Sequence, residues 1–200
     1  MAQVTESTLK FKNKITKGHY GYLKQRKARL LAGALILLLG IAGLVAISLV
    51  KFKTTKTWLA IAAAISAIPA SMSLATYFTL IKYKSRTREE YEELRKITGN
   101  GLLNCELIVP NSEGAAFSFP YIYVHEDGIF ALTNSEKIDL HKTENYVRNY
   151  LRLNQCDGEF RIYEQFETYR KKLKSLAPSD RNTCGEFLLK QEGILRAISM

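Results

Sequence analysis

The chain has 200 residues and a formal net charge of +10, with 46% hydrophobic and 24% charged residues. These averages fit a soluble protein, yet two long segments, 30–50 and 58–81, contain no charged residue. A bilayer core needs about 20 apolar residues in a helix, so each segment is long enough to cross one. The sequence therefore excludes a purely soluble protein, and the remainder is too short for a multidomain enzyme.

The positive charge is concentrated near the two apolar segments. Residues 1–56 carry eleven Lys and Arg against one acid, whereas residues 82–200 carry eighteen basic and eighteen acidic residues. Because the carboxyl-terminal part is neutral, we expect no nucleic-acid partner. Residues 1–29 are predicted to form a basic cytoplasmic arm that contacts the anionic headgroups of a lipid bilayer. An arm that binds RNA would have a similar composition.

The two apolar segments predict a transmembrane helical hairpin over residues 30–81. The first is too long for the core of a signal peptide and is followed by no cleavage site, so we expect it to be retained. Only residues 51–57 join the segments, which indicates a tight antiparallel turn. Twelve Lys and Arg flank the outer ends of the hairpin and three lie in its loop. This asymmetry predicts that both termini are cytoplasmic.

Small residues recur every fourth position of the second segment and form a helix-packing stripe. Two glycines in the first segment offer a matching notch, because small residues let helix backbones approach closely in lipid. We expect the stripe to pack the hairpin against itself; a homo-oligomer or a contact with a protein partner through these helices is the alternative. The predicted packing residues are Ala63, Ala67, Ser71 and Ala75, with Gly40 and Gly43.

The elements after the hairpin predict a small sheet domain. Residues 82–99 form a juxtamembrane helix, in which Thr87 and Glu90 have the spacing of a capping box. Alternating apolar residues predict strands over 102–109, 117–124 and 129–133, with a turn at Asp127-Gly128. Within the second of these, Pro120 indicates an edge strand. Helical spacing resumes near Thr143, and further elements are expected at 160–163, 166–176 and from Thr183.

The predicted architecture is thus an α+β membrane protein in which the hairpin precedes a cytoplasmic α/β sheet domain over residues 100–200. The order of helix, three strands, helix and strand resembles the restriction-endonuclease-like fold. That resemblance implies carboxylates that bind Mg²⁺, for which Glu106 and Asp127 are the weak candidates. The Glu-x-Lys element that such enzymes need is replaced by Ala131-Leu132-Thr133. A degenerate form of the fold agrees better with these residues than an active nuclease.

Several local motifs surround the predicted hairpin. Gly21 to Leu23 and Arg26-Lys27 precede the first apolar segment, Thr54 to Thr57 lies in the loop, and Ala64 to Ala70 reads Ala-Ile-Ser-Ala-Ile-Pro-Ala. In these motifs the chain resembles a group of uncharacterised two-span membrane proteins of Gram-positive bacteria, some of which are named O-linked GlcNAc transferase-like. The resemblance implies the bacterial inner membrane. The sequence lacks the helical repeats of about 34 residues that this name would require.

Signals for catalysis are few. His125-Glu126-Asp127 is expected at a solvated turn, and the three cysteines have neither disulfide-frame nor zinc spacing. No nucleotide-binding, hydrolase or zinc-protease motif is present, so we expect no cofactor. We therefore favour an accessory, scaffold or regulatory protein that acts by binding. The alternatives are a membrane-tethered Mg²⁺-dependent nuclease or defence effector, and a ligand sensor that signals through the hairpin.

Overall fold

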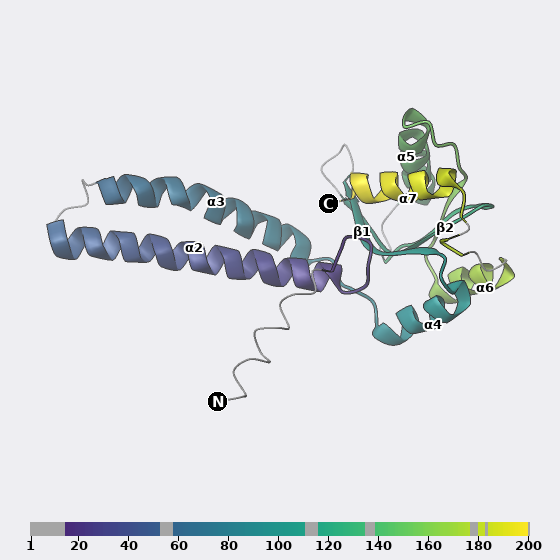
Figure 1. Cartoon of the computed structure of the whole chain (residues 1–200), viewed down its shortest axis with the longest axis horizontal. Coiled ribbons are helices and arrows are strands. Elements are labelled where there is room, and N and C mark those ends of the chain that lie inside the picture. The colour runs from purple at the N-terminus through teal and green to yellow at the C-terminus, as the bar shows by residue number, and fades with distance from the viewer. Residues whose placement is uncertain are drawn as a thin grey trace. The chain divides into compact units, whose positions relative to one another are not determined.

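The computed structural model describes residues 15–52, 58–110, 116–134, 139–176, 180–182 and 184–199. The chain forms two compact units (Figure 1). The first, which we call the hairpin, comprises Leu23–Lys84. The second, which we call the domain, combines Met1–Tyr22 with Ser85–Met200. The segment before the hairpin therefore folds together with the segment that follows it.

The hairpin consists of α2 (Tyr22–Phe52) and α3 (Trp58–Ile81), which run antiparallel (Figure 1). Helix α2 begins eight residues before the predicted span at Leu30, because the intervening residues are mostly strong helix formers. Both helices are long and apolar enough to cross a membrane, with mean hydropathies of 2.8 and 1.5. Only 6% and 11% of their most apolar windows are buried, whereas a core helix of a soluble protein would be mostly covered. Most of the predicted loop, 53–57, lies outside the described residues.

Four strands form the sheet of the domain, in the spatial order β1-β2-β3-β4. They are β1 (Leu102–Pro110), β2 (Ala116–His125), β3 (Gly128–Leu132) and β4 (Phe160–Tyr163). The first three are antiparallel neighbours, and β4 pairs with β3 in parallel. All four strands and the Asp127-Gly128 hairpin agree with the sequence prediction.

Helices cover both faces of this sheet. Helices α4 (Arg88–Thr98) and α6 (Phe166–Ser175) pack on one face, around Tyr121, Tyr123 and Tyr169. Helices α5 (Leu140–Leu153) and α7 (Glu186–Ile198) pack on the other, around Phe119 and Phe160. A sheet buried on both faces needs apolar residues at nearly every strand position, which explains the continuous apolar run of β3.

Side-chain caps set the starts of helices α4 and α5. The Thr87 hydroxyl accepts a hydrogen bond from the backbone N–H of Glu90 at 3.5 Å, as the capping box predicts. The carboxylate of Asp139 caps α5, so this helix begins at Leu140 rather than near Thr143. Helix α7 begins at Glu186; the predicted start at Thr183 lies outside the described residues.

The prediction that Pro120 marks an edge strand is wrong, because β2 lies between β1 and β3. Glu106 of β1 lies opposite Pro120 in the strand register, but the two residues do not pair. The backbone of Glu106 is left-handed, with φ of 57°. Either side of this interruption, Phe119 and Tyr121 face opposite cores. The missing N–H of proline is tolerated in an interior strand because the ladder is already broken there.

Residues 15–21 form a structured arm on the edge of the sheet. The carbonyl oxygen of Gly18 accepts a hydrogen bond from the backbone N–H of Cys105 in β1 at 2.8 Å. The ring of Tyr20 stacks on Tyr91 of α4 with centroids 4.8 Å apart, and its hydroxyl donates to the Arg86 carbonyl at 3.0 Å. The edge of β1 is thereby paired by the chain itself, immediately before α2 begins.

Candidate functional site

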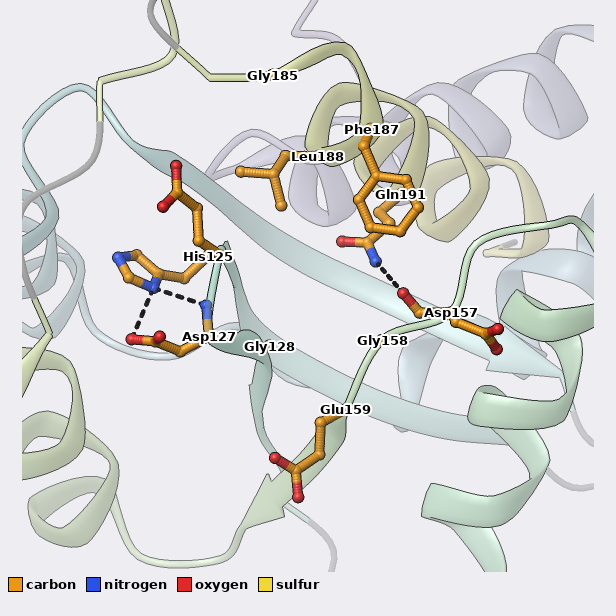
Figure 2. A pocket seen from close by; sticks show the side chains of 11 residues that line it. His125, Asp127, Gly128, Asp157, Gly158, Glu159, Gly185, Phe187, Leu188 and Gln191 are labelled. Carbon is orange, nitrogen blue, oxygen red and sulfur yellow. Dashed lines mark hydrogen bonds and ion pairs between the residues drawn. The ribbon is translucent and has the colours of Figure 1, made fainter.

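A cavity of about 330 Å³ opens where three segments of the domain meet. They are the β2–β3 turn, the connection between α5 and β4, and the first turns of α7 (Figure 2). None of these segments is a neighbour of another in sequence, so only the folded sheet brings them together.

The turn contributes His125, which is only 6% exposed. Its Nδ1 accepts a hydrogen bond from the backbone N–H of Asp127 at 3.2 Å and lies 3.3 Å from the Asp127 carboxylate (Figure 2). In the neutral ring that backbone bond leaves the proton on Nε2. The expectation of a fully solvated turn is therefore wrong for His125, because its ring packs against Tyr123 with centroids 5.8 Å apart.

Two glycines allow the three segments to approach closely. Gly128 has φ of 134°, and a Cβ there would lie 2.8 Å from the carbonyl oxygen of Glu159. A Cβ at Gly158 would lie 2.6 Å from Nε2 of Gln191. Real Cβ atoms do not approach other atoms so closely, so larger residues at either position would push the walls of the cavity apart.

Helix α7 supplies Gln191, which is 2% exposed, and the apolar wall formed by Phe187 and Leu188. The Gln191 amide donates from Nε2 to the carbonyl oxygen of Asp157 at 3.1 Å (Figure 2). This bond holds the amide plane in one orientation. Its oxygen, Oε1, accepts no hydrogen bond from the part of the chain that the structure describes.

The lining of the cavity is strongly acidic. Of the described residues that line it, four carry carboxylates and none is a Lys or Arg. Asp157 and Glu159 have cationic neighbours outside the lining, Arg152 at 3.6 Å and Arg161 at 2.7 Å. The remaining two, Glu126 and Asp127, leave a net negative potential on the side of the turn.

The predicted carboxylate pair is not assembled. Glu106 is 7% exposed and sits in the middle of β1, opposite Pro120, whereas Asp127 lies beyond the end of β2. At about 3.3 Å per residue, the five positions from Pro120 to His125 separate them by roughly 16 Å, too far to share one metal ion. Among the described residues, no three His, Cys, Asp or Glu side chains are grouped so that they could hold a metal.

Burial disfavours the thiolate form of Cys105 and Cys184. Burial, with a smaller contribution from the neighbouring Glu106 carboxylate, raises the pKa of Cys105 to about 12. Burial also raises the pKa of Cys184. A thiol held in its protonated form is unreactive, because the thiolate is the attacking species.

The predicted small-residue stripe lies largely uncovered on α3. Ala63 is buried, whereas Ala67, Ser71 and Ala75 are exposed. A Cβ added at either glycine of the predicted notch, Gly40 or Gly43, would meet no atom within 4 Å. Among the hairpin residues whose burial the structure describes, Ala34, Ser48 and Ala70 are also small and buried.

An ionic network links the helix that lines the cavity to the arm. Glu192, 3% exposed, pairs with Arg181 at 2.8 Å and with Arg196 at 2.7 Å. Arg196 in turn donates to Oδ1 of Asn104 in β1 at 2.6 Å, directly beside Gly18. Desolvation by burial lowers the pKa of Arg196 despite this pairing.

Sequence reasoning missed Gln191 and Glu192. Both occupy the stripe defined by Leu188 and Leu195, one helical turn from each, where apolar residues are expected. Two adjacent polar residues inside a buried stripe are the signal that could have found them.

The chain matches no protein-family model. Neither a curated protein nor a solved structure shows significant similarity to it.

Proposed function

We propose that this chain is a membrane-anchored accessory or regulatory protein that acts by binding through its domain. One observation carries the proposal: the arm before the hairpin and the chain after it fold into a single unit. If the hairpin crosses a bilayer, a domain built from both of its flanks is held at the membrane surface by two chain connections. The acidic cavity then offers the domain a binding site without a set of catalytic residues.

The two exposed apolar helices support membrane insertion, because they would otherwise expose a large hydrophobic surface to water. Both flanks of the hairpin belong to one folded unit, so they must lie on the same side of the bilayer. The twelve-to-three distribution of Lys and Arg favours the cytoplasmic side. The motifs around the hairpin resemble those of two-span proteins of Gram-positive bacteria, and on this resemblance we propose the bacterial inner membrane.

The experiment is chemical cross-linking in native membranes, followed by purification of the full chain and mass spectrometry. The matched control is a chain that ends after Lys84 and therefore keeps the hairpin alone. We expect a partner that is recovered with the full chain and lost with the control. The same set of proteins with both chains would contradict binding through the domain.

The exposed part of the stripe supports a second contact, with another copy of the chain. Small residues that the hairpin does not cover let a neighbouring helix approach closely. Replacing Ala67 or Ser71 by Leu should then reduce a dimer cross-linked in membranes, whereas the exposed Ile65→Leu should not. Undiminished cross-linking in the first two variants would mean that the stripe faces lipid.

A ligand sensor is the second candidate function, and the ionic network favours it. Helix α7 carries Gln191 at the cavity and Arg196 against the arm that leads into α2. A ligand that shifts α7 would therefore act on the chain entering the hairpin. Strand order and the parallel β3–β4 pair also agree with a degenerate restriction-endonuclease-like domain, but the separation of Glu106 and Asp127 does not support an active nuclease.

A further inference from the structure

We propose that the cavity beside Gln191 binds a small organic amine in its ammonium form. The N–H groups of the ligand would donate to Oε1 of Gln191 and to the carboxylates of the β2–β3 turn. Its carbon chain would lie against Phe187 and Leu188. This assignment rests on the proposed binding function and names the class of ligand.

The buried amide of Gln191 requires a hydrogen-bond donor. The side chain is 2% exposed, its Nε2 is engaged by the Asp157 carbonyl, and its Oε1 points toward the middle of the cavity (Figure 2). No described residue donates to this oxygen. This oxygen is open to the solvent in the cavity, so a ligand that displaces that solvent must supply an N–H or O–H group in its place.

The orientation of this acceptor is built into the backbone. Only glycine at 158 leaves room for the Gln191 amide to reach the Asp157 carbonyl, since a Cβ would sit 2.6 Å from Nε2. With Nε2 fixed in this way, Oε1 is the atom left to face the cavity. The acceptor is therefore held in place before any ligand arrives, which lowers the entropic cost of binding.

The charge of the lining favours a cation. Glu126 and Asp127 stand on the turn, while the side chains of Asp157 and Glu159 are directed away from the centre (Figure 2). With Glu126 and Asp127 on the turn and no Lys or Arg among the described residues of the lining, the field favours a cation over a neutral or anionic ligand.

The apolar wall suits the carbon chain of an amine. Phe187 is 48% exposed although it lines the cavity, and Leu188 lies beside it. An aromatic face attracts a cation as well as a hydrocarbon chain. A cavity of about 330 Å³ fits a small molecule, at the lower end of ligand sites.

The test is isothermal titration calorimetry on the full chain in nanodiscs of zwitterionic phosphatidylcholine. The probes are n-butylammonium, the neutral n-butanol, and tetramethylammonium, which carries the charge without an N–H donor. We expect n-butylammonium to bind at least about tenfold more tightly than either of the others.

Two variants at one position isolate the acceptor. Gln191→Met keeps the length but removes Oε1, so n-butylammonium affinity should fall at least about tenfold. Gln191→Glu supplies a carboxylate acceptor but loses the Nε2 bond to the Asp157 carbonyl, so it should bind less tightly than the wild type and more tightly than Gln191→Met. Glu126→Gln should weaken binding about threefold, whereas Glu167→Gln on the distant helix α6 should not change it.

Equal binding of tetramethylammonium and n-butylammonium would overturn the proposal, since it would show a general attraction for cations. Unchanged affinity in Gln191→Met, or no binding of n-butylammonium at about 10 mM, would overturn it too. The proposed function fails separately, because a chain that recruits its partner in membranes but binds no amine refutes only the ligand.

Discussion

Replacing Gly18 by Ala should detach the arm from β1. Gly18 has φ of 89°, and a Cβ there would lie 2.7 Å from both Nε of Arg196 and Oδ1 of Asn104. These two atoms are themselves hydrogen-bonded at 2.6 Å, so the added methyl group would force them apart. The change also threatens the bond from the Cys105 N–H to the Gly18 carbonyl.

The magnitude follows from three contributions. An alanine with a left-handed backbone costs about 1–2 kcal/mol. Loss of the charge-assisted bond between Arg196 and Asn104 costs about 1.5–3 kcal/mol, and loss of the backbone bond about 1 kcal/mol. Because the backbone can relax and not every contact is lost, we expect docking of the arm to weaken by roughly 3–5 kcal/mol.

A second glycine of the arm provides the matched control. Gly21 has φ of 84°, but a Cβ there would meet only Cδ1 of Ile15, at 3.6 Å, which is ordinary van der Waals contact. Gly21→Ala should therefore show the backbone cost of about 1–2 kcal/mol alone. The difference between the two variants isolates the contacts of Gly18.

The assay is amide hydrogen exchange of the peptide that contains Cys105, measured on the full chain in nanodiscs. A difference of about 2–3 kcal/mol between the variants corresponds to roughly 30- to 150-fold faster exchange at Cys105 in Gly18→Ala. Exchange in β3 should be similar in both. Equal exchange at Cys105 in the two variants would refute the packing of the arm against β1.

Three further predictions concern stability and activity. Glu192→Gln should lower the free energy of unfolding by about 2–3 kcal/mol in urea denaturation, because two guanidinium groups lose a buried carboxylate. The control, Glu167→Gln at an exposed residue, should change it by less than about 0.5 kcal/mol. Equal effects of the two variants would contradict the ionic network. Burial raises the pKa of Cys105 to about 12, whereas the unfolded thiol ionises near 9. The free energy of unfolding should therefore be constant below about pH 8 and fall as the pH rises, by about 3 kcal/mol at pH 11. A free energy of unfolding that does not change with pH would contradict this burial. The full chain incubated with DNA or RNA and Mg²⁺ should cleave neither, and function should survive Glu106→Gln, which lies outside the cavity; cleavage that Asp127→Asn abolishes would restore the nuclease alternative.

The elements that the sequence predicts well are those with local causes. The strand at 160–163 is confirmed at both ends, and Thr87 caps α4 as expected, because periodicity and capping act within a few residues. The Asp127-Gly128 turn is likewise set by a single dipeptide.

The features that sequence reasoning misses depend on contacts between distant residues. Pro120 lies in an interior strand only because Glu106, fourteen residues earlier, breaks the same rung of the ladder. His125 is buried by its packing against neighbours that a turn pattern does not reveal. The cavity needs Gly158 and Gln191, which are 33 positions apart, and no local pattern specifies that they meet.

The topology of the hairpin tests the central claim most directly. A reporter that is active only in the cytoplasm would be fused at Met200 and, in a second fusion protein, inserted between Thr54 and Thr55. Both flanks of the hairpin belong to one folded domain, and basic residues surround its outer ends, so we expect activity at Met200 and none in the loop. Activity at both positions would show that the two helices do not cross the membrane and would contradict a domain anchored by both ends of a transmembrane hairpin.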